Sequence, residues 1–222
     1  MRSLPVLALA VCLPLFLEAQ EAPHPDGNEH DEHAVQGGGS VPPGWTARPD
    51  GQTGLDNVKA APMGSGIHVT LGPSIILYRA ANDGKGPFHT LATFTQTKPT
   101  GHAEGYGLFA GGRGLNGPAQ SYVYFLVRQD GSYLIKRRDG DKTSDISKGW
   151  VTDPAVRKPD GGGASTNLLE IDHKRDPSKV VFLVNGKPVH TADAKTLNLD
   201  GIVGLRINHN LDVNVEGFDV HR

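Results

Sequence analysis

The chain has 222 residues, a formal net charge of −2, and 22 basic and 24 acidic side chains that are mixed along its length. This balance gives no electrostatic reason to expect nucleic acid or an anionic membrane as a partner. The 29 glycines and 16 prolines predict many turns, which is typical of short strands rather than of a helical protein.

The first 22 residues are typical of a secretory signal peptide. A positive start, Met1-Arg2, precedes an apolar run over residues 4–17 and then small residues. The run is shorter than the ~20 apolar residues that span a bilayer, so no membrane span is expected. The single cysteine, Cys12, lies in this segment, and Val11 before it does not fit a lipoprotein signal. We therefore expect a secreted or periplasmic protein whose mature chain has no disulfide.

Residues 23–44 are polar and contain the stretches HPDGNEHDEH, GGGS and VPPG. They have no apolar period, so we expect a flexible, disordered tether, followed by one domain over residues 45–222. His24, His30 and His33 lie close in sequence to several carboxylates, and both imidazole and carboxylate groups can ligate transition metals. Because nothing in such a segment preorganises them, we predict no cofactor, with weak metal binding as the alternative.

Short alternating runs separated by turn residues begin at Trp45, and no stretch has a sustained helical period with caps. Strands without intervening helices favour an antiparallel sandwich or barrel. The eleven predicted strands are 67–71, 74–79, 90–97, 106–110, 122–128, 132–138, 168–173, 179–184, 187–190, 202–207 and 211–220.

The strand 122–128 is apolar on both faces, so we expect it to be central and covered on both sides. Asp130-Gly131 predicts a turn into the next strand, and Asn185-Gly186 predicts a tight hairpin between two β-forming runs. In the last strand the apolar residues occupy odd-numbered positions before Gly217 and even-numbered positions after it. This change of face indicates a β-bulge at Gly217. In the strand 122–128, one face carries Val123, Phe125 and Val127, and the other carries Tyr122, Tyr124 and Leu126.

A series of segments appears in a characteristic order: GYGLFAGG, SYVYFLVRQDGSYLIKRR, NLLEIDH, VVFLVNGKPV, DGIVGLRI and VNVEGFDV. From Trp45 to the C-terminus this series resembles laminin-G-like, concanavalin-type jelly rolls, and the secreted bacterial branch with 3-keto-disaccharide hydrolase domains is the most similar. The resemblance implies an all-β, antiparallel two-sheet jelly-roll sandwich. It does not imply one function, because this fold hosts lectins, adhesion modules, carbohydrate-binding modules and glycosidases.

The stretch LLEIDHKRD resembles the catalytic strand of laminarinase-type β-glucanases, in which alternating carboxylates share one face. Glu170 and Asp172 match that motif, but Lys174 or Arg175 stands where a further glutamate is needed. A lysine cannot replace the acid/base carboxylate at neutral pH without a large change in its pKa. We therefore predict no catalytic residue and expect both carboxylates to face water, with the intervening apolar residues in the core.

The loop RRDGDKTSD brings Asp139, Asp141 and Asp145 together. Their oxygens could bind calcium weakly, but the loop lacks a complete calcium-binding pattern. A polar hairpin tip is the favoured interpretation, so no metal site is predicted.

Sugars are held by aromatic rings that stack on their CH faces and by polar groups that bond their hydroxyls. Two tyrosines share one face of strand 122–128, and the next strand, a following loop and the turn before the last strand add further aromatic and polar groups. Lys136 and Asn210 lie in the same segments. The predicted ligand-binding residues, on a concave sheet, are Tyr122, Tyr124, Tyr133, Arg138, Trp150, Arg206, Asn208 and His209.

The leading hypothesis is an exported, non-catalytic β-sandwich module that binds a glycan or another extracellular ligand. The first alternative is a glycoside hydrolase or lyase of the 3-keto-disaccharide hydrolase-like type, as the resemblance implies. The second is a purely structural or adhesive domain. Binding and product formation on a panel of oligosaccharides would discriminate among the three.

Overall fold

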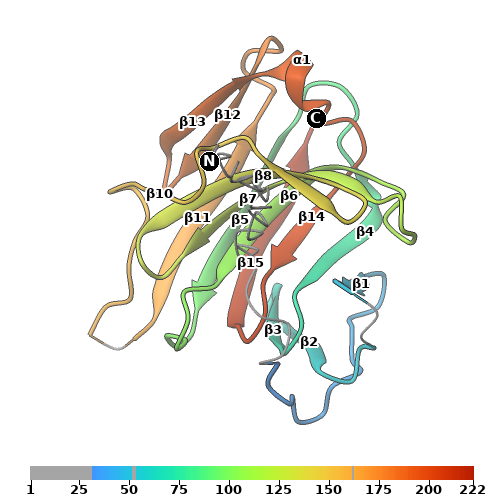
Figure 1. The fold of residues 1–222 in the computed structure, drawn as a ribbon, viewed down its shortest axis with the longest axis vertical. Helices are drawn as coiled ribbons and strands as arrows, with labels where there is room; N and C mark the ends of the chain where they lie inside the picture. The colour runs from blue at the N-terminus through green and yellow to red at the C-terminus, as the bar shows by residue number, and fades with distance from the viewer. Residues whose placement is uncertain (1–31, 52–53, 162) are drawn as a thin grey trace, which may run out of the picture.

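The computed structural model describes residues 32–51, 54–161 and 163–222, which form two β-sheets packed face to face (Figure 1). The predicted all-β class is confirmed, and the helix α1 in these residues is a single turn. No helix in the described residues is long and apolar enough to cross a membrane. The elements are β1 (Thr46–Pro49), β2 (Val58–Met63), β3 (Gly66–Leu71), β4 (Ile75–Asp83), β5 (His89–Gln96), β6 (Gly105–Arg113), β7 (Ser121–Arg128), β8 (Ser132–Asp139), β9 (Lys142–Asp145), β10 (Val151–Thr152), β11 (Ser165–Asp172), β12 (Lys179–Val184), β13 (Lys187–Asp193), α1 (Ala194–Leu197), β14 (Ile202–Ile207) and β15 (Asp212–His221).

The eight-stranded sheet has the order β1-β4-β14-β6-β7-β8-β10, and β9 also pairs with β8. The seven-stranded sheet has the order β13-β12-β11-β5-β15-β3-β2. The late strands β14 and β15 lie inside the two sheets, between strands that come much earlier in the chain. Three of the edge strands, β1, β2 and β13, contain a proline: Pro49, Pro62 and Pro188. Proline has no N–H to donate, so it is tolerated at these edges.

Strand β7 contributes to two apolar layers. Its residues Val123, Phe125 and Val127 lie in the core between the sheets, and its alternate residues lie in a smaller cluster on the opposite, outer face of the eight-stranded sheet. The side chains of residues 122–127 are at most 3% exposed, so the prediction of a strand covered on both faces is confirmed. We call the second layer the outer-face cluster; its buried members are Ile76, Tyr78, Phe109, Leu115, Tyr122, Tyr124, Leu126 and Leu134.

The predicted turns are present. Asn185 and Gly186 have φ values of 51° and 73°, as a tight turn of type I′ requires, and they join β12 to β13. Strands β7 and β8 form the second predicted hairpin. In β15 the pairing with β5 shifts register between Glu216 and Asp219, around Gly217 at φ 64°, so the predicted bulge is confirmed.

The sequence patterns did not predict β1, β2, β9, β10 or α1. Strand β2, VKAAPM, has alanines and a proline with low β-propensity, and its conformation depends on pairing with β3. Helix α1 likewise depends on a distant strand, because Arg137 on β8 donates to the carbonyl oxygens of Thr196 and Leu197 at 2.8 and 2.7 Å. The cap residues of α1, Asp193 and Asn198, are local, but a helix of one turn is too short to show a helical period in the sequence.

Residues 32–44 belong to the segment that the sequence assigns to the tether, and here they make hydrogen bonds to the sandwich. The backbone N–H of Gly39 donates to the carbonyl oxygens of Leu55 and Val58, and Ser40 accepts from the N–H of Ala60 at 2.8 Å. The predicted signal peptide and the tether up to residue 31 lie outside the described residues. The domain boundary at residue 45 stays a prediction.

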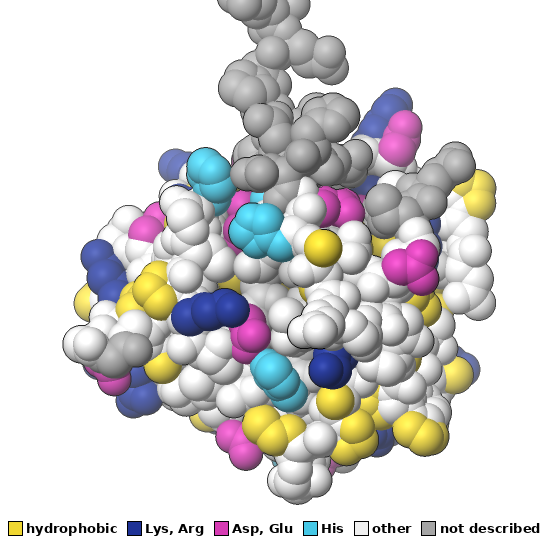
Figure 2. Space-filling model, turned by 90° about the horizontal axis from the view of Figure 1, so that it is seen from below, with side chains coloured by type: hydrophobic (Ala, Val, Ile, Leu, Met, Phe, Trp, Pro, Cys, Tyr) yellow, Lys and Arg dark blue, Asp and Glu magenta, His cyan; other side chains and the backbone are white. Residues whose placement is uncertain are grey.

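The lower end of the molecule carries side chains of mixed charge. Figure 2 shows acidic, basic and histidine side chains interspersed on this end, with hydrophobic side chains gathered toward one side. This distribution agrees with the balanced composition of the chain. The outer face of the eight-stranded sheet instead carries the apolar outer-face cluster.

Candidate functional site

Neighbouring strands place aromatic rings side by side on the outer face of the eight-stranded sheet. Tyr78 on β4 is opposite Gly204 on β14, which is opposite Phe109 on β6. Because Gly204 has no side chain, the Phe109 ring occupies that space: a Cβ atom at Gly204 would lie 2.5 Å from Phe109 Cε1. The Phe109 ring centroid is 6.4 Å from that of Tyr78 and 5.2 Å from that of Tyr122. The Tyr122 centroid is 5.8 Å from that of Tyr124, so the aromatic row is continuous.

A buried ion-pair network lies beside this row. Nη2 of Arg206 on β14 is 2.5 Å from Oδ2 of Asp50, and Nη1 of Arg138 on β8 is 3.0 Å from the same oxygen. Nε of Arg206 donates to Oδ1 of Asn208 at 3.2 Å, and the guanidinium carbon is 5.8 Å from the Tyr124 ring centroid. Burial opposes ionisation of Asp50, but the two arginines outweigh it and hold the pKa of that carboxyl below its ordinary value.

Two hydrogen-bond donors of this face have no partner. The hydroxyl of Tyr122 and Nη1 of Arg206 are buried and make no hydrogen bond, and each side chain belongs to a residue that is 2% exposed. Burial raises the pKa of Tyr122, although the nearby Arg206 opposes this effect. The phenol therefore stays protonated at neutral pH and is able to donate.

Five of the eight predicted site residues come together at this face: Tyr122, Tyr124, Arg138, Arg206 and Asn208. Lys136 also lies on it, opposite Tyr124 in the register, with Nζ 3.6 Å from Asp145. The cross-strand register and the alternation of side chains are what bring these distant segments together.

Trp150 and His209 lie at the end of the same sheet. The Arg128 guanidinium is 4.2 Å from the Trp150 ring centroid, and the indole packs against the outer-face cluster. His209 Nε2 is 3.3 Å from Oε1 of Glu104, and both side chains are nearly buried. Trp150 therefore borders the outer-face cluster, whereas His209 contacts Glu104 at the end of the sheet.

The prediction that Tyr133 shares this face is wrong. Its ring lies in the core between the sheets, with its centroid 6.3 Å from that of Phe125, and its hydroxyl donates to the carbonyl oxygen of Val189 at 2.9 Å. The cause is the length of the β7–β8 loop. Arg128 pairs with Ser132, so Tyr133 pairs with Val127 and points inward. With a two-residue turn at Asp130-Gly131, Tyr133 would have pointed to the outer face instead.

Sequence reasoning missed several residues of this face. Tyr78 and Phe109 lie on predicted strands, and knowledge of which strands are neighbours would have assigned them to it. Asp50 and Arg48 lie in a stretch with no strand pattern. Arg48 donates to Oε1 of Gln120 and, at 3.4 Å, to the carbonyl oxygen of Gly117. No sequence signal indicated that the Asp50 side chain reaches Arg206 on β14 across β4.

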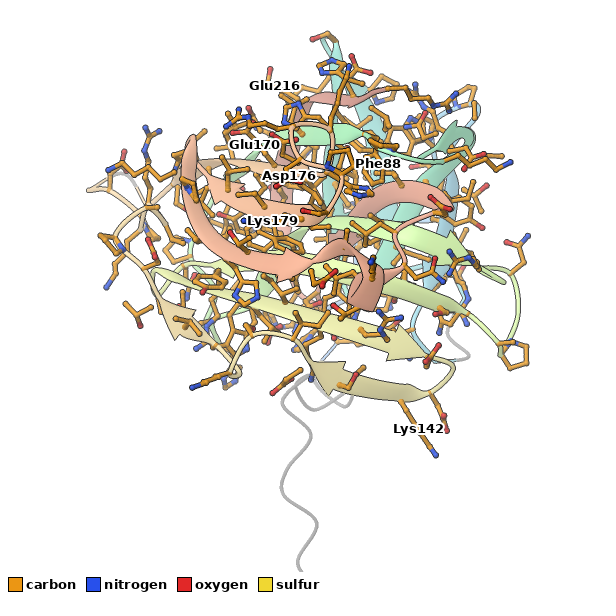
Figure 3. All side chains as sticks on the ribbon, turned by 90° about the horizontal axis from the view of Figure 1, so that it is seen from above. Phe88, Lys142, Glu170, Asp176, Lys179 and Glu216 are labelled. Carbon is orange, nitrogen blue, oxygen red and sulfur yellow. The ribbon has the colours of Figure 1, made fainter. Side chains whose placement is uncertain are left out.

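The carboxylates of the LLEIDHKRD stretch lie elsewhere. Glu170 is on the seven-stranded sheet, and Figure 3 shows it far from Lys142 on β9 of the other sheet. Its Oε2 is 3.0 Å from Nε2 of His89. The expectation that Asp172 faces water is wrong: Asp172 is 8% exposed, because Oδ1 accepts from the backbone N–H groups of residues 174 and 175. The apolar residues that alternate with these carboxylates, Leu169 and Ile171, are in the core as predicted.

Among the described residues, no group of three or more His, Cys, Asp or Glu side chains is placed to hold a metal ion. Asp139 and Asp145 end the strands of the β8–β9 hairpin, and Asp141 lies at its tip. His24 and His30 lie outside the described residues.

No protein-family model and no curated protein matches this chain. Solved structures do share its architecture, which is that of a two-sheet, antiparallel jelly-roll sandwich, and the predicted fold class is thereby confirmed. The identities are at most 14%, so the similarity shows the fold alone.

Three of these structures are informative. A carbohydrate-binding module, CBM66 of Bacillus subtilis, aligns with a TM-score of 0.58 at 13% identity, over 81% of this chain and 96% of that chain. The carbohydrate recognition domain of Emp46p aligns with a TM-score of 0.53 at 14% identity, over 80% and 88%. The β-glucanase of Bacillus licheniformis aligns with a TM-score of 0.52 at 10% identity, over 82% and 92%.

Proposed function

We propose that the protein is an exported, secreted or periplasmic, non-catalytic module that binds a carbohydrate on the outer face of its eight-stranded sheet. The observation that carries this proposal is the aromatic row beside the Asp50–Arg206–Arg138 network. A sugar needs apolar rings for its CH faces and directional polar groups for its hydroxyls, and this face offers both. The carbohydrate-binding module and carbohydrate recognition domain that share the fold support the same function.

The rings and the unpartnered donors are buried, so ligand binding requires movement at the border of the face. Trp150, Arg48 and Arg138 are partly exposed and border the buried rings. A ligand reaches Tyr124 when such border side chains swing aside, which is a local rearrangement of rotamers rather than of strands.

The second candidate is a hydrolase similar to the 3-keto-disaccharide hydrolases. The fold shared with a β-glucanase supports it. Glu170, paired with His89 at 3.0 Å, is the carboxylate that such an activity would use. Glu170 lies on the other sheet, so the two candidate functions would use different surfaces and can be separated by mutation. A purely structural domain would bind and cleave nothing.

The test uses Tyr124→Ala and Glu170→Gln, with calorimetry on a panel of oligosaccharides and chromatography of products. Under the binding proposal, Tyr124→Ala weakens binding about fivefold, because an aromatic contact contributes on the order of 1 kcal/mol. Glu170→Gln leaves binding unchanged. Under the hydrolase candidate, Glu170→Gln abolishes product formation and leaves binding intact.

Melting curves come first, because Tyr124 is buried in the outer-face cluster and its truncation lowers stability. Binding is then measured well below the melting temperature of the variant. If the folded Tyr124→Ala protein binds every glycan as the parent does, the outer face is not the site.

A further inference from the structure

Two buried hydrogen-bond donors on the outer face have no acceptor within the described part of the protein. Nη1 of Arg206 and the hydroxyl of Tyr122 make no hydrogen bond, and both residues are 2% exposed. Buried polar groups in native proteins are rarely left without a partner. A guanidinium nitrogen only donates, and a protonated phenol donates as well, so one acceptor group on a ligand can satisfy both.

The charge on this face is positive. Arg48, Arg138, Arg206 and Lys136 gather there on strands β1, β8 and β14, and the Coulomb fields of the three arginines reach the hydroxyl of Tyr122. The carboxylates paired with these groups are Asp50 and Asp145. Four cations against two carboxylates contrast with the near balance of the whole chain. An anionic acceptor therefore fits better than a neutral hydroxyl.

We propose that the ligand is an acidic glycan and that a uronic-acid carboxylate accepts hydrogen bonds from Nη1 of Arg206 and the hydroxyl of Tyr122. This inference rests on the proposed carbohydrate-binding function and narrows its ligand class. The ligand carboxylate accepts from these two donors, while Asp50 stays bonded to Nη2 of Arg206 and holds the guanidinium in place. The aromatic row then lies beside the sugar rings of the chain.

The first experiment compares ligands that differ only in charge. Polygalacturonate, alginate and hyaluronate are each titrated into the protein by calorimetry at pH 7, beside their carboxyl-reduced forms and a sulfated neutral polysaccharide. We expect at least one uronate polymer to bind at least tenfold more tightly than its reduced form, with an affinity that falls as salt rises. Equal binding of the charged and reduced forms overturns the carboxylate assignment and leaves carbohydrate binding standing. Binding of the sulfated polymer alone also overturns it. Binding of none of these polymers overturns the acidic-glycan assignment, whereas the proposed carbohydrate binding fails only if the oligosaccharide panel also gives no binding.

The second experiment removes single hydroxyl groups. Tyr122→Phe deletes a hydroxyl that has no partner, so the melting temperature should not fall, while affinity for the uronate polymer falls about tenfold. Tyr133→Phe is the matched control: its hydroxyl bonds Val189 in the core, so the melting temperature falls and affinity does not change. If Tyr122→Phe binds the uronate polymer as tightly as the parent, the proposed contact does not exist.

Discussion

Nη2 of Arg206 lies 2.5 Å from Oδ2 of Asp50, and the two residues are 156 positions apart in the chain. The contact joins the residue that follows edge strand β1 to a strand inside the same sheet. The backbone N–H of Asp50 also donates to the carbonyl oxygen of Ser74 at 2.8 Å, which fixes the position of the carboxylate. Because the ion pair is buried, loss of one partner leaves the other charge uncompensated.

The variant Asp50→Asn should lower the free energy of unfolding at pH 7 by about 3 kcal/mol, since it breaks a buried ion pair and leaves two arginines without their carboxylate. Urea denaturation followed by circular dichroism measures this change. Asp139→Asn, an exposed aspartate at the end of β8, is the control and should change stability by less than about 0.5 kcal/mol. Equal small effects of the two variants would show that the network is not stabilising.

The same carboxylate makes stability depend on pH. Burial opposes the ionisation of Asp50, but Arg206, Arg138 and Arg48 together outweigh it, so the pKa of this carboxyl is lowered in the folded protein. Its ionisation therefore stabilises the fold above the ordinary value of 3.8, and this stabilisation is lost as the pH falls below that value. The difference in unfolding free energy between the parent and Asp50→Asn should shrink between about pH 5 and pH 2. A constant difference across this range would contradict the assignment.

The Asn185-Gly186 turn also anchors a buried amide network. The Asn185 side chain donates to the carbonyl oxygen of Ala155 at 2.8 Å and to Oδ1 of Asn167 at 2.9 Å, and Asn167 is fully buried. Asn185→Gly keeps the left-handed conformation but loses these bonds, so we expect a loss of about 2 kcal/mol. Gly186→Ala meets no atom within 4 Å and should lose about 1 kcal/mol from backbone strain. Thermal denaturation of both variants tests this order, and the reverse order would refute it.

Gly204 should not tolerate a side chain. A Cβ atom there would lie 2.5 Å from the carbonyl oxygen of Leu77 and 2.5 Å from the Phe109 ring, so Gly204→Ala must displace backbone or an aromatic ring. We expect a loss of at least about 2 kcal/mol. Gly101→Ala is the matched control, because nothing lies within 4 Å of its Cβ position and its φ is not positive. Denaturant titration that finds the two variants equally stable would contradict this packing.

Truncation tests the boundary of the domain. A chain that starts at residue 45 loses the backbone hydrogen bonds of Gly39 and Ser40, whereas a chain that starts at residue 32 keeps them. With three bonds at about 1 kcal/mol each, the shorter chain should melt on the order of 5–10 °C lower. Calorimetry of the two chains measures the difference. Equal melting temperatures would support the tether boundary at residue 45.

Local patterns predicted most of the fold. The alternation in β7 and the Asn185-Gly186 turn are properties of a few adjacent residues, so strands, hairpins and the fold class could be predicted from them. Strand β1 and helix α1 could not, because their conformations depend on partners far away in the chain. Pairing of β1 with β4 leaves no signal in that segment, and α1, although Asp193 and Asn198 cap it, is too short to show a helical period.

The candidate site was predictable only in part, for a related reason. Alternation placed Tyr122 and Tyr124 together, but the face of Tyr133 depends on the number of residues in one loop, which Asp130-Gly131 does not determine. Asp50 was missed because its role depends on two arginines from β8 and β14. The ion-pair network is a consequence of tertiary structure, and only a three-dimensional structure shows it.

The prolines at the sheet margins bear on how this protein meets other molecules. Pro49, Pro62 and Pro188 interrupt the donor pattern of β1, β2 and β13, and the remaining edge strands, β9 and β10, are only four and two residues long. A foreign strand therefore finds no long, regular ladder to join, which disfavours amyloid-like growth and strand exchange between copies. If the protein recognises a ligand, the broad faces of the sandwich are therefore better suited to it than the edges of the sheets.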